Sequence, residues 1–174
     1  VNLQEQVILV DPEDRELGQA EKLAAHEQGL LHRAFSIFLF DDQGNMLLQK
    51  RASSKYHTGG LWTNTCCSHP RPNVPIENTL DYKLMQELGI SCAVEKAFNF
   101  LYKAELDNGL IEYELDHVYL GNFSGKPEPN PNEVEDWAYR NIGDIKADID
   151  ENPQLYTPWF KMLFIPILAH LGQG

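Results

Sequence analysis

Residues 33–40 spell RAFSIFLF, a stretch rich in aromatic and β-branched side chains. This composition favours a central β-strand. The segment DDQGN at 41–45 carries the residues of a tight turn, and MLLQKR at 46–51 predicts the returning strand of a hairpin. The rest of the chain is therefore expected to assemble around a sheet with this hairpin in it.

Other segments supply further strands and helices. Residues 7–11 predict a first strand, and residues 18–28 predict a short helix or an ordered loop. Residues 77–88 predict a helix, because leucines recur there every four residues and Gly89 is suited to end it. Strands are also expected at 92–102, 111–120 and 133–139, with helices near 142–148 and at 157–171. The pattern predicts an α+β fold, a mixed sheet with helices packed against it.

Length and charge limit the classes of function. The chain has 174 residues, which suits one domain, 1–174, with its own core. Its net charge of −12 argues against a nucleic-acid or anionic-membrane surface, although local Lys and Arg can still hold a small anion. The absence of a long apolar run, of a secretory signal and of a disulfide framework favours a cytoplasmic protein. We expect a monomer.

The motif TNTCCSHP at 63–70 brings two cysteines next to a histidine. In extended backbone neighbouring side chains point to opposite faces, so Cys67 and His69 can share a cavity while Cys66 packs into the core. A thiol beside a metal-bound imidazole can shift towards thiolate. Two alternatives remain open: both cysteines are small buried apolar residues, or the motif is a zinc knuckle, although Cys92 supplies no second pair.

Imidazole and carboxylate groups form a candidate metal site. Glu112 and Glu114 are two apart in a predicted strand and face the same side, where burial without a cation would be costly. Three imidazoles with two carboxylates suit a six-coordinate divalent ion such as Mn²⁺, Zn²⁺ or Mg²⁺. The alternative is a solvated strand edge with scattered surface histidines. The candidate ligands are His26, His32, His69, Glu112 and Glu114.

Four basic residues, Lys22, Arg51, Lys55 and Lys83, lie near these motifs and suit a diphosphate, unless they are ordinary surface charges. Glu87 in QELGI, residues 86–90, has the position of a carboxylate on a Nudix helix, but Lys83 and Gln86 stand where two further carboxylates would be. A single carboxylate can hold one Mg²⁺ on a ligand's phosphates. Tyr102, Trp62 and Trp159 are expected in the core, or else beside a developing cation.

These stretches together resemble one family. LLHRAFS at 30–36, TNTCCSHP at 63–70, ELG at 87–89 and EYE at 112–114 are similar to type I isopentenyl-diphosphate Δ-isomerases, over most of the chain. The resemblance implies a Nudix-like α/β/α sandwich. It also implies an enzyme that interconverts isopentenyl and dimethylallyl diphosphate in isoprenoid biosynthesis, by protonating one carbon and deprotonating another.

The resemblance also assigns roles to residues. It implies that Cys67 and Glu114 are catalytic, and that a divalent ion is bound by His26, His32, His69, Glu112 and Glu114. Glu87 would hold a Mg²⁺ on the substrate diphosphate. Residues in contact with the substrate would be Lys22, Arg51, Lys55, Lys83, Tyr102 and Trp159.

The chain departs from the family pattern at a few positions. Lys83 replaces an Arg found in some members, Tyr82 replaces a common basic residue, and Asn73-Val74 replaces a common Gly-Glu pair. Two other hypotheses compete with the isomerase: a Nudix hydrolase of a nucleoside or prenyl diphosphate, and a non-enzymatic zinc-binding module.

Overall fold

The central element is the predicted strand, observed as β3, His32–Phe40. A computed structural model describes residues 5–172 of the chain and places β3 in a nine-stranded mixed sheet. β3 pairs antiparallel with β1, β4 and β6, and parallel with β8. This strand therefore touches segments that are far apart in sequence, which makes it the frame of any site built on the sheet.

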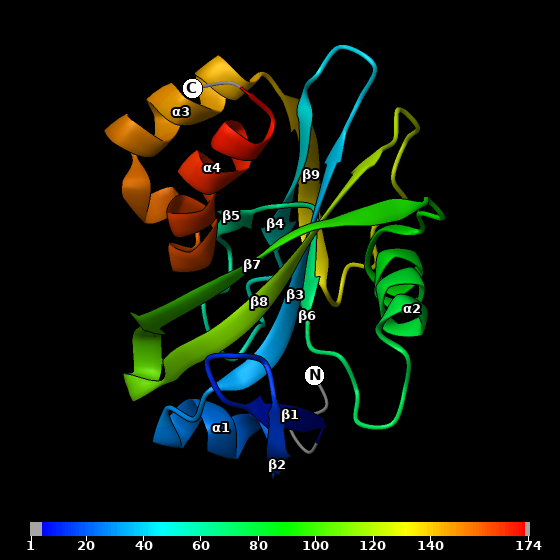
Figure 1. Cartoon of the computed structure of the whole chain (residues 1–174). Helices are drawn as coiled ribbons and strands as arrows, with labels where there is room; N and C mark the ends of the chain where they lie inside the picture. The colour runs from blue at the N-terminus through cyan, green and yellow to red at the C-terminus, as the bar shows by residue number, and fades with distance from the viewer. Residues whose placement is uncertain (1–4, 173–174) are drawn as a thin grey trace.

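Helices cover both faces of the sheet (Figure 1). On one side α2, Ile76–Leu88, packs its leucines against Phe35, Ile37 and Leu39. On the other side α4, Pro158–His170, packs against Phe38 and Phe40, with α3, Ile142–Glu151, beside it. The alternation along β3 thus divides its side chains between two cores. The expected α/β/α sandwich is confirmed.

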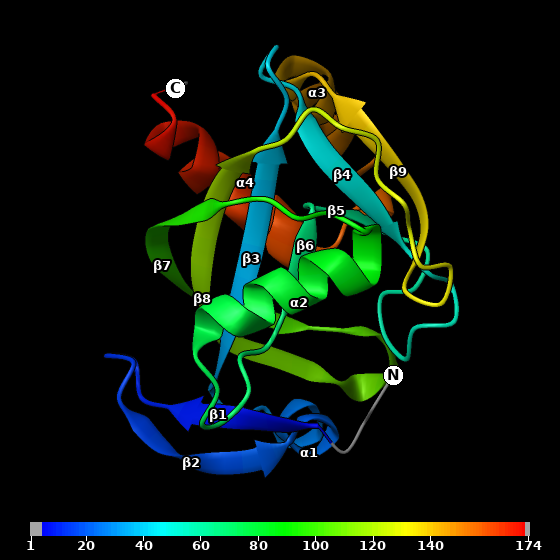
Figure 2. The ribbon, with the colours of Figure 1, turned by 90° about the vertical axis from the view of Figure 1, so that its right-hand side faces the viewer.

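One segment differs from its prediction. Residues 18–28 were expected to be a short helix or an ordered loop, but they contain the end of a strand, β2, Glu16–Glu21, followed by α1, Lys22–Gln28. β2 pairs only with β1, Gln6–Val10, and is exposed over most of its length. Such an edge strand carries no apolar alternation, because neither of its faces packs against a core. Figure 2 shows this pair with α1 at one end of the molecule.

The other predicted elements are present with shifts of a few residues at their ends. Gly89 ends α2 in a left-handed conformation with φ of 64°, as expected. Within residues 5–172 no helix combines the length and apolar character that crossing a bilayer requires. The remaining strands are β4 Met46–Arg51, β5 Trp62–Thr63, β6 Cys66–Ser68, β7 Val94–Glu105, β8 Ile111–Asn122 and β9 Val134–Arg140, with short 3-10 turns at Asp107–Gly109 and Pro153–Leu155.

Candidate active site

Alternate residues of three strands face one pocket. The register of β3 with β6 places Ser36 opposite Cys67, and its register with β8 places His32 opposite Glu114. Paired residues on neighbouring strands point to the same face, and so do residues an even number apart. Because His32 and Ser36 are four positions apart, the thiol and the carboxylate share a face. Strand geometry alone therefore collects residues from three segments of the sequence.

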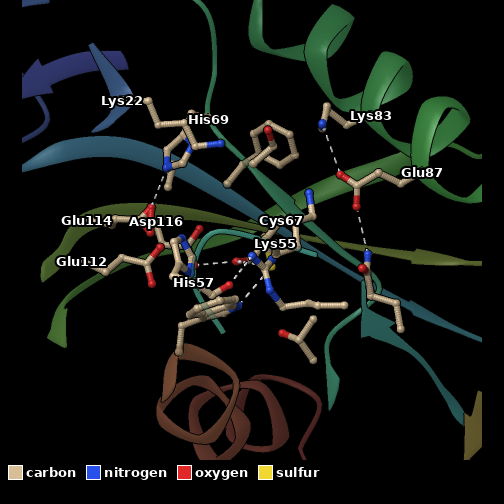
Figure 3. Close-up of a pocket in the computed structure, with 18 of the residues that line it drawn as sticks. Lys22, Lys55, His57, Cys67, His69, Lys83, Glu87, Glu112, Glu114 and Asp116 are labelled. Atoms are coloured by element: carbon tan, nitrogen blue, oxygen red, sulfur yellow. Dashed lines mark hydrogen bonds and ion pairs between the residues drawn. The ribbon is translucent and has the colours of Figure 1, made fainter. Parts of the chain in front are cut away.

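The predicted site residues lie together around this pocket (Figure 3). The two that do not line it, His26 and His32, are fully buried and pack against His69, with ring centroids 5.9 and 5.0 Å from that ring. All the others contribute to the pocket wall: Lys22, Arg51, Lys55, Cys67, His69, Lys83, Glu87, Tyr102, Glu112, Glu114 and Trp159.

The imidazole and carboxylate groups have the spacing of ligands on a common ion. The Nε2 atoms of His32 and His69 are 3.3 Å apart. Oε2 of Glu114 lies 3.1 Å from Nε2 of His69 and 3.6 Å from Nε2 of His32. Oε1 of Glu112 lies 3.8 Å from Nε2 of His26. Metal–ligand distances of about 2.1 Å put neighbouring ligands about 3 Å apart, so these side chains need little movement to bind one cation.

The hydrogen bonds of the rings support a cation at this point. Nδ1 of His26 lies 2.7 Å from the carbonyl oxygen of Lys22, and Nδ1 of His32 lies 2.8 Å from that of Leu30. A carbonyl only accepts, so each Nδ1 donates, and when the ring is neutral its lone pair is at Nε2, on the side of the cluster. Nε2 of His26 and Oε2 of Glu112 are buried without a hydrogen-bond partner. Converging lone pairs of this kind fit a divalent metal ion.

The two glutamates are not on a solvated edge, since Glu112 is 5% and Glu114 3% exposed. Burial and the charge of Glu114 raise the pKa of Glu112. Burial acts on Glu114 in the same direction, but the interaction with His32 outweighs it and lowers the pKa of Glu114 to about 2. Burial, followed by the charge of Lys22, lowers the pKa of His69 well below its usual value. The neutral ring that results is the form that binds metals.

The two adjacent cysteines point to opposite sides, as expected. Cys66 is fully buried in the core beneath α2. Cys67 faces the pocket, where its thiol lies 2.9 Å from Oδ1 of Asn64. Burial, then the charge of Asp116, raises the pKa of the Cys67 thiol. Burial and the nearby carboxylate favour the protonated thiol over the thiolate. The shift towards thiolate expected beside a metal-bound imidazole stays a prediction.

The cysteines do not form a zinc knuckle. Among the described residues, the side-chain groups with metal-ligand spacing contain only His and Glu. The thiol of Cys92 instead lies 3.1 Å from the carbonyl oxygen of Asn122, at the far end of β8. The zinc-knuckle hypothesis has no second pair of ligands in this part of the chain.

Trp159 reaches the pocket because the start of α4 is tied to the cysteine motif. The backbone N–H of Thr157 donates to the carbonyl of Trp62 at 3.0 Å, and its hydroxyl donates to that of Thr63 at 2.9 Å. The Thr157 side chain also accepts the N–H of Phe160 and so caps the helix. Trp159, the second residue of α4, is thereby held against Cys67.

The aromatic residues divide between core and pocket. Tyr102 lies on β7 directly opposite Glu114 and donates its hydroxyl to Oε1 of that residue at 2.7 Å. Tyr102 and Trp159 are both buried, both line the pocket and pack in one cluster with Cys67. Trp62 instead packs against the main core. Two of the three aromatic side chains expected in the core thus also form a pocket wall.

Two of the basic residues, Lys55 and Lys83, lie in the part of the pocket next to α2. Nζ of Lys83 lies 3.3 Å from Oε2 of Glu87, whose Oε1 accepts the amide of Gln49 at 3.0 Å. Lys55 forms an ion pair with Glu133. The side chains of Lys55 and Lys83 are only 14% and 16% exposed, so they are not ordinary surface charges. Burial lowers the pKa of Lys83, but the neighbouring Glu87 carboxylate more than compensates and keeps the ammonium charged.

The sequence did not predict three ionisable pocket residues, Tyr56, His57 and Asp116. Asp116 is buried and accepts the hydroxyl of Ser36 at 2.6 Å. It continues the alternation of Glu112 and Glu114, and this spacing could have identified it. His57 lies in the loop between β4 and β5, with its ring centroid 5.4 Å from that of His26. No spacing in the sequence indicates that contact, which depends on how the loop folds.

Comparisons with known proteins agree on one family. A NUDIX domain model matches residues 30–160. Two proteins of Aromatoleum aromaticum, isopentenyl-diphosphate Delta-isomerases 2 and 1, are each 47% identical to the chain. The alignment with the first protein covers 90% of this chain and 83% of that protein. The alignment with the second covers 96% of this chain and 94% of that protein. An isopentenyl-diphosphate Delta-isomerase of Serratia proteamaculans is 45% identical, over 98% of this chain and 93% of its own.

Solved structures share the fold at low identity. DR0079 from Deinococcus radiodurans superposes with a TM-score of 0.70 at 18% identity, covering 85% of this chain and 90% of that protein. A likeness at this identity supports the arrangement of the sheet and helices. The shared motifs, the NUDIX match and the extent of the sequence identity lead to one conclusion: the chain belongs to the isopentenyl-diphosphate Delta-isomerase family, within the Nudix fold.

Proposed function

We propose that this enzyme interconverts isopentenyl diphosphate and dimethylallyl diphosphate through Cys67 and Glu114. The observation that carries the proposal is that these two side chains line one pocket, each bound by an aromatic residue. Trp159 donates to the Cys67 sulfur at 3.2 Å, and Tyr102 donates to the Glu114 carboxylate at 2.7 Å. Two proton-transfer groups with an apolar, aromatic space at the same face suit a double-bond shift.

The reaction needs one proton delivered and one removed. A proton adds to the terminal alkene carbon, the π electrons form the new C–H bond, and a tertiary cation remains. A base then removes a proton from the neighbouring methylene, and the electrons of that C–H bond form the new double bond. No redox step occurs. We assign Glu114 to the terminal carbon and Cys67 to the methylene.

The pKa shifts match one end of the proposed turnover. The raised pKa of Cys67 and the lowered pKa of Glu114 favour a thiol beside a carboxylate. That state is the product of the forward reaction, after Glu114 has given its proton and Cys67 has taken one. It is also the starting state for the reverse reaction. Successive forward turnovers therefore require one proton exchange with solvent between them.

The aromatic wall protects and stabilises the cation. The indole of Trp159 offers a π face, and cation–π contacts strengthen when the site is desolvated. The guanidinium of Arg51 already lies 5.3 Å from the centre of that ring, so the ring accepts positive charge on one side. Burial of Trp159 and Tyr102 keeps water from a carbocation that would react with it.

Two cation sites complete the proposal. A divalent ion at His26, His32, His69, Glu112 and Glu114 supplies positive charge that orients the Glu114 carboxyl group and tunes its acidity; Mn²⁺, Zn²⁺ and Mg²⁺ all suit these ligands. Glu87 is proposed to hold Mg²⁺ on the substrate diphosphate. Lys22, Arg51, Lys55 and Lys83 are proposed to bind the phosphate oxygens.

The diphosphate end of the pocket favours isomerisation over hydrolysis. On α2 the side chains of Lys83 and Gln86 stand where a Nudix hydrolase would hold further metal-binding carboxylates. Lys83 pairs with Glu87, and Gln86 bonds to Glu133 at 3.4 Å. Both interactions suit a site that binds a diphosphate without activating water against it.

The proposal that residues 1–174 form one domain is supported by α1, whose Lys22 and His26 lie before the NUDIX match yet join the site. A monomeric state and a cytoplasmic location stay predictions.

Proton NMR in D₂O distinguishes the two reactions. The purified protein is given isopentenyl diphosphate, Mg²⁺ and, in parallel samples, Mn²⁺ or Zn²⁺. Isomerisation should convert the terminal alkene signals into those of the dimethyl alkene and introduce deuterium. Phosphate release with unchanged alkene signals would identify a hydrolase and refute the proposal.

A further inference from the structure

A fourth imidazole enters the proposed metal cluster from the loop between β4 and β5. His57 is 5% exposed, and its ring lies between those of His26 and Trp159, at centroid distances of 5.4 and 6.1 Å. One ligand atom each from His26, His57 and Glu112 lie within 4.8 Å of one another. The same spacing relates His26, His32 and His69, and relates His69, Glu112 and Glu114. His57 thus lies as close to His26 and Glu112 as the five proposed ligands lie to one another within their two groups of three.

The neighbours of His57 leave one ring nitrogen for a metal. Nδ1 lies 2.7 Å from the hydroxyl oxygen of Thr58. When Nδ1–H donates to that hydroxyl, the lone pair of the neutral ring is at Nε2. Fixing one ring nitrogen by a hydrogen bond is how proteins orient metal-binding histidines. His26 and His32 show the same arrangement with carbonyl oxygens in place of a hydroxyl.

The loop backbone holds His57 in this position. Thr58 has a φ of 50°, a left-handed conformation that β-branched residues rarely adopt. Its N–H donates to Oδ1 of Asp107 at 3.1 Å, and the carbonyl of His57 accepts from Nη2 of Arg51 at 3.3 Å. Strain of this kind persists where surrounding contacts enforce it, and it is concentrated at functional sites. The loop therefore presents the imidazole to the cluster in a defined orientation.

Two buried atoms opposite His57 call for a ligand. Nε2 of His26 and Oε2 of Glu112 have no hydrogen-bond partner. They belong to the two residues that His57 joins in one group. Nε2 of His26 has one lone pair in the neutral ring and can therefore bind only one ion. His26 belongs both to the group with His57 and to the group with His32 and His69, so the two groups cannot use His26 to bind two separate ions. One shared ion satisfies both groups.

We propose that Nε2 of His57 is a sixth protein ligand of the divalent ion, on the side of His26 and Glu112. This inference rests on the proposed metal site and extends its ligand set. Six protein donors would close the coordination sphere of an octahedral ion. Sites closed in this way position groups and supply charge, whereas sites that act directly on a substrate keep a position open. The ion would then act on the reaction only through its own ligands, above all Glu114.

The test follows the imidazole nitrogens of uniformly ¹⁵N-labelled full-length protein during titration with Zn²⁺. Long-range ¹H–¹⁵N spectra report metal binding at each ring nitrogen. The chain has six histidines. We expect the Nε2 signals of His26, His32, His57 and His69 to shift together, complete at one equivalent. His117, which pairs with Asp14, and His170 serve as internal controls and should not move.

The possible results separate the inference from the proposed site. If three imidazoles shift and His57 does not, the sixth-ligand assignment is wrong and the five-ligand site stands. If no imidazole shifts, the proposed metal site itself is wrong. If His57 shifts only with a second equivalent of Zn²⁺, the single shared ion is wrong. The spectra of the wild-type protein alone distinguish these outcomes, so the test does not require a variant that folds.

A binding measurement adds a second, quantitative readout. Competition with a chromophoric chelator should give a Zn²⁺ affinity at least about tenfold weaker in His57→Ala than in the wild type. His117→Ala, a substitution of another buried histidine outside the pocket, should bind Zn²⁺ like the wild type. In the Co²⁺ form, His57→Ala should absorb more strongly in the visible range, because loss of a ligand lowers the coordination number. Equal affinity and equal spectra for His57→Ala would overturn the proposal.

Discussion

The indole N–H of Trp159 donates to the sulfur of Cys67 at 3.2 Å, across 92 positions of the sequence. The same sulfur lies 2.9 Å from Oδ1 of Asn64, three residues before it. The thiol is therefore held by one local partner, one partner from α4 and the hydroxyl of Ser36 on β3, which donates to the sulfur at 3.8 Å. Cys66, its neighbour in sequence, has no part in this arrangement and belongs to the core beneath α2.

This division predicts different results for two neighbouring substitutions. Cys67→Ala should lower kcat by about 10²–10⁴-fold, the range for loss of a positioned proton-transfer group. Cys66→Ala should leave kcat within about threefold, and should lower the free energy of unfolding by about 1 kcal/mol through a small cavity. Isomerase assays and urea denaturation measure the two effects. An equal loss of activity in both variants would mean that the backbone direction of the motif is wrong.

The protonation state of Cys67 predicts a pH dependence for its alkylation. Burial raises the pKa of the thiol, so the reactive thiolate is scarce at neutral pH and increases as pH rises above the ordinary thiol range. Iodoacetamide labelling, followed by mass spectrometry of the Cys67 peptide, should be slow at pH 7 and accelerate tenfold for each pH unit above it. Trp159→Phe removes the N–H that donates to the sulfur and should slow labelling further. Rapid labelling at pH 7 would show that the pKa is lowered instead.

The two buried glutamates predict how metal removal changes stability. Burial and the charge of Glu114 raise the pKa of Glu112 above its unfolded value. A raised pKa contributes stability that is complete below the unfolded value, near pH 4.5, and is lost as pH rises through the folded value. Glu114 has a lowered pKa, so its contribution changes below pH 4.5 and does not cancel this loss. The contribution of Glu112 to the stability of the chelated protein should therefore fall as pH increases above about 4.5, whereas the lowered pKa of His69 acts in the opposite direction up to about pH 6.5.

Thermal denaturation with and without a chelator tests this expectation. Glu112→Gln has no charge to bury, so the chelated variant should lack that part of the pH dependence and exceed the chelated wild type in Tm at pH 8. Added Zn²⁺ or Mn²⁺ should raise the Tm of the wild type, since a ligand that binds the native state stabilises it. Glu95→Gln, at an exposed strand position, should behave like the wild type. If the stability of the chelated wild type relative to chelated Glu112→Gln does not fall from pH 5 to pH 8, the pKa direction for Glu112 is wrong.

Sequence reasoning succeeded where side-chain periodicity decides the outcome. The alternation that places Glu112 and Glu114 on one face, and Cys67 and His69 on another strand of that face, follows from the two-residue repeat of a strand. The pairing of these strands with β3 then brings the groups together. The spacing thus predicted which side chains share a face, whereas the catalytic and binding roles of these residues were implied by the family resemblance.

The sequence could not give what depends on tertiary contacts. β2 has no apolar alternation, so only its pairing with β1 identifies it as a strand. His57 enters the pocket because Asp107 and Arg51 fix its loop, and neither contact leaves a pattern in the sequence. The raised pKa of Cys67 depends on burial and on Asp116, which lies 49 positions later in the chain.

The carboxylate of Glu87 predicts a specific dependence on Mg²⁺. Its two oxygens are occupied by Gln49 and Lys83, at 3.0 and 3.3 Å, so the carboxylate is fixed at the edge of the proposed diphosphate site. Glu87→Gln keeps the shape and one of the two acceptor oxygens but removes the charge that attracts Mg²⁺. The Mg²⁺ concentration that gives half-maximal activity should rise at least about tenfold, while kcat at saturating Mg²⁺ stays within about threefold, because Glu87 has no role in proton transfer.

Activity measured across Mg²⁺ concentrations, with Zn²⁺ or Mn²⁺ held constant at the His/Glu site, separates the two cation sites. Glu77→Gln is the matched control, since Glu77 lies on the same helix but is exposed and away from the pocket. It should leave the Mg²⁺ dependence unchanged. An unchanged dependence in Glu87→Gln as well would show that Mg²⁺ reaches the enzyme on the diphosphate alone, and Glu87 would then serve to hold Lys83 in place. In that case Lys83→Met should raise KM for isopentenyl diphosphate as much as Glu87→Gln does.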